Sequence, residues 1–177
     1  DNLANASNPA QAQYGLIGIS GVDSAAKTSL LGDVIDTKIA ADVDRAAELQ
    51  TLADAVTAVV AGANGGTAPT LAQLQSLGIV GVTPDNLGAI QHAIEASAND
   101  GSGVGTLAGL QGLAATAATA LAAIGSYAQD STGNAPTAQT YVEAGVSGAA
   151  SNLASINDAL ATAAVTAASV NTSAKVQ

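Results

Sequence analysis

The sequence predicts an all-α protein, built as tandem three-helix repeat units, two full and one partial, that form an elongated helical bundle array. The first observation is a residue frame that occurs three times: Pro, four residues, Tyr or Leu, three residues, Gly, Ile or Val, one residue, Gly. The second is that apolar residues between the frames recur at helical spacing. Self-similarity of this kind is typical of repeat architectures. The three frames are Pro9–Gly21, Pro69–Gly81 and Pro136–Gly148.

Each frame has a physical interpretation as a short helix followed by a tight turn. Proline fits the first turn of a helix, where no N–H partner is lost. The Tyr or Leu is expected on the buried side, and the first glycine at a left-handed C-terminal cap. The next Ile or Val is expected to tuck under the helix end, and the second glycine lets the chain turn again. These anchors are Pro9, Tyr14, Gly18, Gly21, Pro69, Leu74, Gly78, Gly81, Pro136, Tyr141, Gly145 and Gly148.

The first repeat is predicted over residues 9–68, after a loose polar segment at residues 1–8. Its second helix is marked by Leu30, Leu31, Val34 and Ile35, which share one helix face. Its third helix carries one apolar stripe, which the glycine-rich run 62–66 ends. The stripe consists of Val43, Leu49, Leu52, Val56, Val59 and Val60.

The second repeat is predicted over residues 69–135. Thr83-Pro84-Asp85 is a helix start, with a hydroxyl cap, a proline in the first turn and an acid near the positive end of the helix dipole. The second helix then has 3–4 spacing at Leu87, Ile90 and Ile94. A long third helix follows, with apolar positions at Leu107, Leu110, Leu113, Ala117, Leu121 and Ile124.

The third repeat, residues 136–177, is predicted to be partial or capping. Leu153, Ile156 and Leu160 repeat the stripe of the second helix. After Leu160 the pattern fades, so either this helix lengthens or a weak third helix begins near Thr162. We expect the exposed face around Leu153, Ile156 and Leu160 to be an assembly face, covered head-to-tail by a neighbouring repeat or another copy. The rival is that Val165 and Val170 fold back and complete the bundle.

Composition excludes several classes of function. The chain of 177 residues has a net charge of −10, which disfavours nucleic acid and anionic membranes as partners. No segment is expected to be apolar for long enough to span a bilayer. The chain has no cysteine, so disulfides and thiolate metal sites are excluded. We expect no cofactor and no metal.

Chemistry-bearing residues have ordinary interpretations. His92 is the single histidine, and a solvated helix position explains it better than catalysis or metal binding, so no enzyme is predicted. The acidic cluster lacks the spacing of a calcium loop and reads as a charged helix face. It consists of Asp33, Asp36, Asp42 and Asp44. Asn5-Ala6-Ser7 and Asn171-Thr172-Ser173 match the glycosylation pattern, which recurs by chance in such a chain.

Three segments carry a resemblance to a known family. They are Leu30–Ala58, the run G-V-T-P-D-N-L-G-A-I at Gly81–Ile90, and the run from Tyr141 to Leu160. Each is similar to helical repeats of very large secreted bacterial surface adhesins of the biofilm-associated and RTX types. The resemblance implies spacer or adhesive modules without catalytic residues, at the bacterial cell surface or secreted. The alternative is a three-helix ligand-binding module that grips a host protein.

Overall fold

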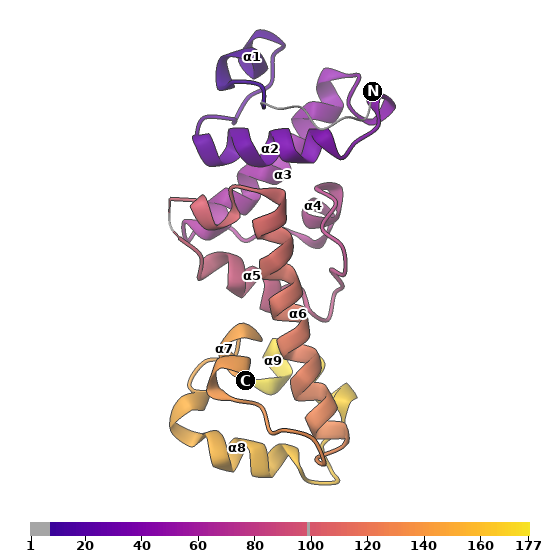
Figure 1. Cartoon of the computed structure of the whole chain (residues 1–177), viewed down its shortest axis with the longest axis vertical. Coiled ribbons are helices and arrows are strands. Elements are labelled where there is room, and N and C mark those ends of the chain that lie inside the picture. Colours follow the sequence, from indigo (N-terminus) through magenta and orange to yellow (C-terminus); the bar gives the residue numbers. More distant parts are fainter. Residues whose placement is uncertain (1–7, 99) are drawn as a thin grey trace. The chain divides into compact units, whose positions relative to one another are not determined.

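The computed structural model describes residues 8–98 and 100–177, and every regular element in these ranges is helical (Figure 1). The predicted all-α class is therefore confirmed. Of the predicted loose segment 1–8, all but Asn8 lies outside the described residues. The α-helices are α1 (Gln11–Leu16), α2 (Ala25–Asp36), α3 (Ala46–Ala63), α4 (Leu71–Ser76), α5 (Leu87–Glu95), α6 (Leu107–Gln129), α7 (Ala138–Glu143), α8 (Leu153–Leu160) and α9 (Ser173–Val176). The 3₁₀ helices are η1 (Ala40–Asp42), η2 (Ser102–Val104), η3 (Ala149–Asn152) and η4 (Ala167–Ser169).

The chain divides into two compact units. The N-terminal unit comprises Asp1–Val80 and Ile94–Gly112, and the C-terminal unit comprises Gly81–Ala93 and Leu113–Gln177. The repeat boundaries predicted from sequence, at 68/69 and 135/136, each fall inside a unit. In the N-terminal unit the reason is packing across the boundary, because α4 lies against α3.

The helix ends in the three frames share one backbone geometry. All three first glycines are left-handed, with φ of 83° at Gly18, 84° at Gly78 and 75° at Gly145. The N–H of the following residue donates to the carbonyl of the frame's large residue, from Ile19 to Tyr14, Ile79 to Leu74 and Val146 to Tyr141, at 3.0, 3.1 and 2.8 Å. This is a Schellman cap, in which glycine avoids the steric cost of the left-handed region. The cap expected from the sequence is confirmed.

The large residue of each frame is buried beneath its cap. Tyr14, Leu74 and Tyr141 are 3%, 0% and 0% exposed. The Ile or Val after the glycine is buried as well, as the hydrophobic contact of a Schellman cap requires.

The prediction that proline stands in the first helical turn is wrong. Pro69 and Pro136 each precede the N-cap residue, which is Thr70 or Thr137. The threonine hydroxyl accepts from the N–H of Gln73 or Thr140, and such a hydroxyl is the preferred partner for an unpaired N–H group. The proline therefore fixes the extended approach to the helix.

A glutamine side chain holds each turn from the side. Between the two left-handed glycines lie Ser20, Val80 and Ser147, whose N–H groups each donate to a glutamine Oε1 at 2.9 Å. The same glutamine donates from Nε2 to the carbonyl of the same residue, at 3.3, 3.2 and 3.3 Å. These glutamine clamps are Gln50, Gln111 and Gln177. Each stands five residues after the residue that precedes α3, α6 or α9.

Long-range polar contacts tie the N-terminal unit together. Asp33 on α2 accepts from the N–H of Leu107 at 3.0 Å, which places a carboxylate at the start of α6. Lys38 donates to the carbonyl of Ser76 at 2.8 Å, where α4 ends. Asn8 donates to the carbonyl of Ser29 at 3.0 Å.

The end of the chain follows neither of the two helix alternatives, but Val165 and Val170 do fold back onto the bundle, as the rival interpretation expected. Helix α8 stops at Leu160, and α9 begins at Ser173 rather than near Thr162. The segment between them contains η4 and brings Val170 into the core of the C-terminal unit, while Val165 packs against that core half-buried. Other members of this core come from α6, from α7 and its C-cap, and from α8: Ala120, Leu121, Ile124, Tyr141, Ala144 and Leu160.

The expectation that no stretch is apolar enough to span a bilayer is wrong for one helix. Among the described residues, α6 is long and apolar enough to cross a membrane by length and composition. The reason is that alanine and threonine interrupt its apolar residues but no charged side chain does. Its large side chains Leu110, Leu121 and Ile124 are buried in the folded chain.

The buried frame residue sets a stability prediction. Leu74→Ala removes a fully buried side chain and leaves a cavity, so we expect a loss of about 2–5 kcal/mol in the free energy of unfolding. Leu16→Ala is the matched control, because Leu16 is 86% exposed, and a surface change costs below about 0.5 kcal/mol. Urea titration of dilute protein measures both. A loss below about 0.5 kcal/mol for Leu74→Ala would contradict the buried anchor.

Candidate binding groove and assembly surface

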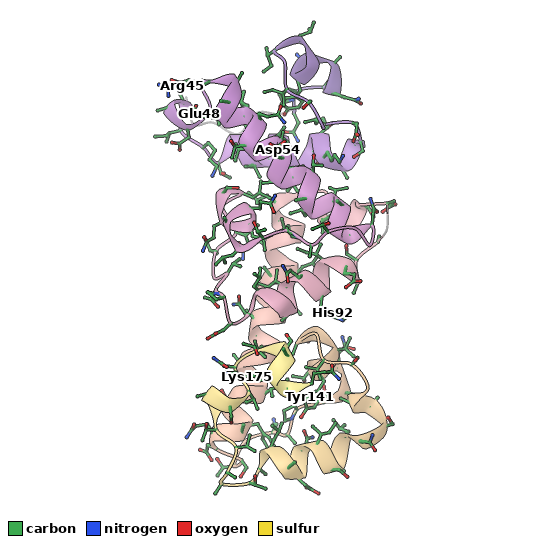
Figure 2. The ribbon with its side chains drawn as sticks, turned by 180° about the vertical axis from the view of Figure 1, so that it is seen from behind. Arg45, Glu48, Asp54, His92, Tyr141 and Lys175 are labelled. Carbon is green, nitrogen blue, oxygen red and sulfur yellow. The ribbon has the colours of Figure 1, made fainter. Side chains whose placement is uncertain are left out.

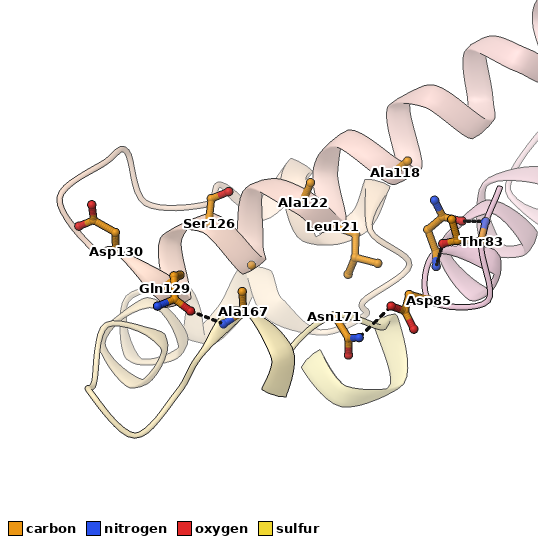
Figure 3. A pocket seen from close by; sticks show the side chains of 12 residues that line it. Thr83, Asp85, Ala118, Leu121, Ala122, Ser126, Gln129, Asp130, Ala167 and Asn171 are labelled. Carbon is orange, nitrogen blue, oxygen red and sulfur yellow. Dashed lines mark hydrogen bonds between the residues drawn. The ribbon is translucent and has the colours of Figure 1, made fainter. Parts of the chain in front are cut away.

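A groove of about 510 Å³ opens in the C-terminal unit (Figure 3). Its apolar part comes from small side chains, including Ala118, Ala122 and Gly125 on α6 and Ala167 on η4, together with Leu121. Polar side chains complete the lining: Thr83, Asp85, Asn86, Ser126, Gln129, Asp130 and Asn171.

Two hydrogen bonds cross from the groove's walls to the segment around η4. The Nδ2 of Asn171 donates to Oδ2 of Asp85 at 2.9 Å, and the N–H of Ala167 donates to Oε1 of Gln129 at 3.4 Å (Figure 3). They hold the segment 167–171 beside α6 and the start of α5 without filling the space between.

In the N-terminal unit, the segment equivalent to 167–171 packs closely against its neighbours. Gly101 and Gly105 stand five and one residues before Thr106, as Ala167 and Asn171 stand before Thr172. A Cβ atom on Gly101 would lie 3.1 Å from Cβ of Ala26 and 3.1 Å from Cγ1 of Val60, so the backbone there is in close contact.

The C-terminal unit carries larger residues at the equivalent positions. Ala167 and Asn171 have side chains where the N-terminal unit has glycine, and Asn86 takes the place of Ala26, five residues after the second glycine of its frame. Ala167 lies close to Gly125 on α6, where an added Cβ would be 3.7 Å from its own Cβ.

The groove suits a slender, largely apolar group. Alanine and glycine leave a narrow floor, while Asp85 and Asp130 place carboxylates at the rim. Those charges disfavour an anionic ligand. Amide and hydroxyl groups of Gln129, Ser126 and Thr83 can donate or accept hydrogen bonds to fix an orientation.

The predicted assembly face is partly used inside the C-terminal unit. Leu160 is buried in its core, and Leu153 and Ile156 are half-buried against that core. A second groove, of about 340 Å³, borders this face between α8 and the segment that leads into α9. Its lining includes Ile156, Leu160, Val165 and Val176. Assembly through this face stays a prediction.

The two frame tyrosines, Tyr14 and Tyr141, differ in whether their hydroxyl groups have a hydrogen-bond partner. Tyr141 lies in the C-terminal unit (Figure 2). It donates to Oδ1 of the buried Asn157 at 2.7 Å, and Asn157 donates to the carbonyl of Pro136 at 2.9 Å. Burial, followed by the nearby Tyr127, raises the pKa of Tyr141 to about 12, so the hydroxyl stays a proton donor.

The hydroxyl of Tyr14 is buried and has no hydrogen-bond partner in the described part of the chain. The apolar Leu31 follows Leu30 where Asn157 follows Ile156 on α8, so the equivalent helix position offers no acceptor. Burial and then the charge of Asp36 raise the pKa of Tyr14. The unsatisfied oxygen is expected to cost stability.

The structure assigns local roles to other residues singled out in the sequence. His92 lies half-buried on α5, and a Cβ atom on Gly145 would lie 3.1 Å from its Cβ, so His92 contributes to packing beside that turn. Asp33 contacts the start of α6, whereas Asp42 and Asp44 are exposed. Within the described ranges, no three His, Asp or Glu side chains gather as a metal site would require.

Of the two glycosylation patterns, Asn5-Ala6-Ser7 lies outside the described residues. Asn171 is half-buried and engaged on both sides of its amide. It donates to Asp85, and its Oδ1 accepts from Nζ of Lys175 at 2.6 Å.

Sequence reasoning missed the groove and the glutamine clamps. The clamps had a detectable signal, because Gln50 and Gln111 stand five residues after the residue that precedes α3 and α6, and Gln177 has the same spacing from the residue before α9. The groove had none, since it depends on how closely two backbones approach. Comparison of the chain with family models, with curated proteins and with solved structures finds no match.

The two tyrosines provide a matched pair of substitutions. Tyr141→Phe leaves Asn157 with an unpaired buried oxygen, so we expect a loss of about 1–3 kcal/mol in the free energy of unfolding. Tyr14→Phe removes an unsatisfied hydroxyl, and we expect no loss or a small gain. Urea titration measures both variants. Equal losses, or a greater loss for Tyr14→Phe, would show that the hydroxyl groups are not satisfied as described.

Proposed function

We propose that this chain is a non-catalytic structural module of a secreted bacterial adhesin stalk or extracellular filament, acting in surface attachment or biofilm. The observation that carries the proposal is the recurrence, at three turns, of one backbone arrangement: a short helix, a Schellman cap, two left-handed glycines and a glutamine clamp. Three independent turns would have no reason to share all four features. Repetition of one unit is the usual basis of stalks and arrays.

The proposed repeat consists of a short helix, the glycine turn, a second helix, a 3₁₀ segment and the third helix that carries the clamp. Repeat 1 is residues 9–68, repeat 2 is 69–135 and repeat 3 is 136–177. Helix α9 takes the place of α3 and α6 in repeat 3, because Gln177 stands in the same register as Gln50 and Gln111. Repeat 3 then contains the first turn of its third helix.

Packing between neighbouring repeats supports this division. Helix α4 and segment η2 of repeat 2 contact α3 of repeat 1, and η2 also contacts α2. In the C-terminal unit, Ala144 and Val170 of repeat 3 share one core with Leu121 and Ile124 of repeat 2. Repeats 2 and 3 therefore each pack their first helix and their 3₁₀ segment against the repeat before. Such nearest-neighbour interlocking is how solenoid arrays gain stability.

The proposed location and attachment rest on the resemblance to adhesin repeats, and the composition is compatible with export. A chain without cysteine folds without forming disulfides, so its folding does not depend on the redox state of the compartment. Its proposed partners are neighbouring repeats or other copies of itself.

The groove of about 510 Å³ favours a second candidate function, that of a ligand-binding module gripping a host protein. An apolar side chain of a host protein would enter between Ala118 and Ala167, with its flanking backbone near Gln129. The structural function accounts for the geometry that all three turns share. The ligand-binding function accounts for one groove in the C-terminal unit.

Display on a non-adhesive bacterium tests the proposal. We expect cell retention on glass under flow to rise when the displayed chain is duplicated and triplicated, because a stalk acts through its length. The matched control is a groove variant, Ala122→Glu, whose exposed alanine is expected to tolerate a charge. The ligand-binding module would be favoured instead by retention with three properties. It would not depend on copy number, it would require a coating of host protein, and it would be lost in Ala122→Glu.

A further inference from the structure

The groove of about 510 Å³ carries a carboxylate at each of its two ends (Figure 3). Asp85 lies at one end, beside Asn171, and Asp130 lies at the other, beyond Gln129. Asp85 accepts from Nδ2 of Asn171 through Oδ2, and Asp130 accepts from the N–H of Thr132 through Oδ1. These contacts use one oxygen of each carboxylate, so the other oxygen can accept from a ligand.

Within the described residues, no cation of the chain pairs with either carboxylate. The C-terminal unit contains four acidic residues and one lysine, Lys175. The ammonium of Lys175 donates to Oδ1 of Asn171 at 2.6 Å and to the carbonyl of Ala168 at 3.1 Å, and Lys175 does not line the groove. The ion pairs found in the described residues all lie in the N-terminal unit. A positively charged ligand would therefore meet two carboxylates and no competing lysine.

The floor between the two carboxylates is narrow and mainly apolar. Ala118, Ala122 and Gly125 follow one another along α6, and the stretch from Ala118 to Gln129 is about 16 Å long at a rise of about 1.5 Å per residue. Small side chains leave space for methylene groups, whose removal from water is favourable. Ser126 lies on the same stretch, and its hydroxyl oxygen can accept from a donor in the middle of a ligand.

The two carboxylates are not part of the repeat pattern. Asp85 stands four residues after the second glycine of its frame, where repeat 1 has Ala25. Asp130 stands nineteen residues after the glutamine clamp of its repeat, where repeat 1 has Pro69. The glycine turn and its clamp form in repeat 1 without either charge, so the repeat architecture does not account for these two acids.

We propose that this groove binds a linear aliphatic polyamine, a chain of methylene groups with an ammonium group at each end. One terminal ammonium would donate to Asp85 and the other to Asp130, while the methylene groups lie on the alanine and glycine floor. Charge complementarity favours this occupant, because the groove offers two separated carboxylates with an apolar surface between them. A single lysine side chain of a partner protein would satisfy one end only. The proposal does not rest on the structural function of the repeats.

Calorimetric titration of the full chain with spermine tests the proposal. Spermine is a linear tetraamine whose terminal nitrogens lie about 16 Å apart when extended, at about 1.2 Å per bond, so its length matches the floor. Putrescine is a short diamine with the same terminal groups, and it cannot reach both carboxylates. We expect spermine to bind with one molecule per chain, and putrescine to bind at least about tenfold more weakly.

A pair of variants with the same net charge separates the groove from the overall acidity of the chain. Asp130→Asn removes the carboxylate at one end, and we expect it to weaken spermine binding about fivefold. The matched control is Asp158→Asn, because Asp158 is exposed on α8 and does not line the groove. We expect this control to bind spermine like the unchanged chain.

A second pair of variants tests the floor without changing any charge. Ala122→Leu places a larger side chain on the floor, and we expect it to weaken spermine binding about tenfold or more through steric exclusion. Its control is Ala123→Leu, because Ala123 is exposed on the same helix and does not line this groove. Circular dichroism checks that each variant folds.

Three results would overturn the proposal. The first is no binding of spermine at millimolar concentration, and the second is an equal loss of binding in Asp130→Asn and Asp158→Asn, which would indicate attraction to the acidic chain as a whole. The third is binding of a lysine-containing or apolar peptide in the groove without binding of spermine, which would assign the groove to a protein partner. None of these results changes the expected dependence of cell retention on copy number, so the structural function is decided separately.

Discussion

The fold depends on satisfying the backbone of one residue between two left-handed glycines. The two left-handed glycines of each turn stand three residues apart, and the N–H groups of Ser20, Val80 and Ser147 between them donate to a glutamine instead of to a helix carbonyl. A glutamine amide carries one acceptor and one donor and can pair with both the N–H and the C=O of such a residue at once. The identities of the central residues differ, but the clamp is the same in all three turns. The groups that need a partner are the backbone N–H and C=O of the central residue, so the clamp does not depend on which side chain that residue carries.

This clamp links local structure to packing over long sequence separations. It holds α3, α6 and the residue after α9 against the turns that follow α1, α4 and α7, across 30 or 31 residues. Helices α1, α4 and α7 are six residues long, and such a helix is not stable alone. Its stability comes from the cap, the buried large residue and the neighbouring helix. Small side chains then allow the remaining helices to approach closely, as Gly101 does against Ala26 and Val60.

The sequence predicted the features that recur and missed those that depend on approach between backbones. The all-helical class, the left-handed glycines and the burial of Tyr14, Leu74 and Tyr141 followed from residue type and spacing. The prolines Pro69 and Pro136 lie two residues before the first helical residue and not in the first turn, because Thr70 and Thr137 take the N-cap position. The start of α9 was missed because its apolar pattern is weak and its position is fixed by Gln177 and Val170, far from any periodic stripe. The groove was not predicted, since residue type and spacing do not show how closely the segment around Ala167 and Asn171 approaches α6.

Hydrogen exchange at the three turns tests most directly whether the clamps organise the chain. The amides of Ser20, Val80 and Ser147 belong to exposed residues, so an unclamped turn would exchange them rapidly. The account predicts slow exchange at all three, and selective loss of protection at Val80 in Gln111→Met, with Ser20 unchanged. The near-isosteric methionine keeps the volume and removes both hydrogen bonds, and Gln75→Met on an exposed position serves as the control. Rapid exchange at these amides in the unchanged chain, or equal protection in Gln111→Met, would contradict the account.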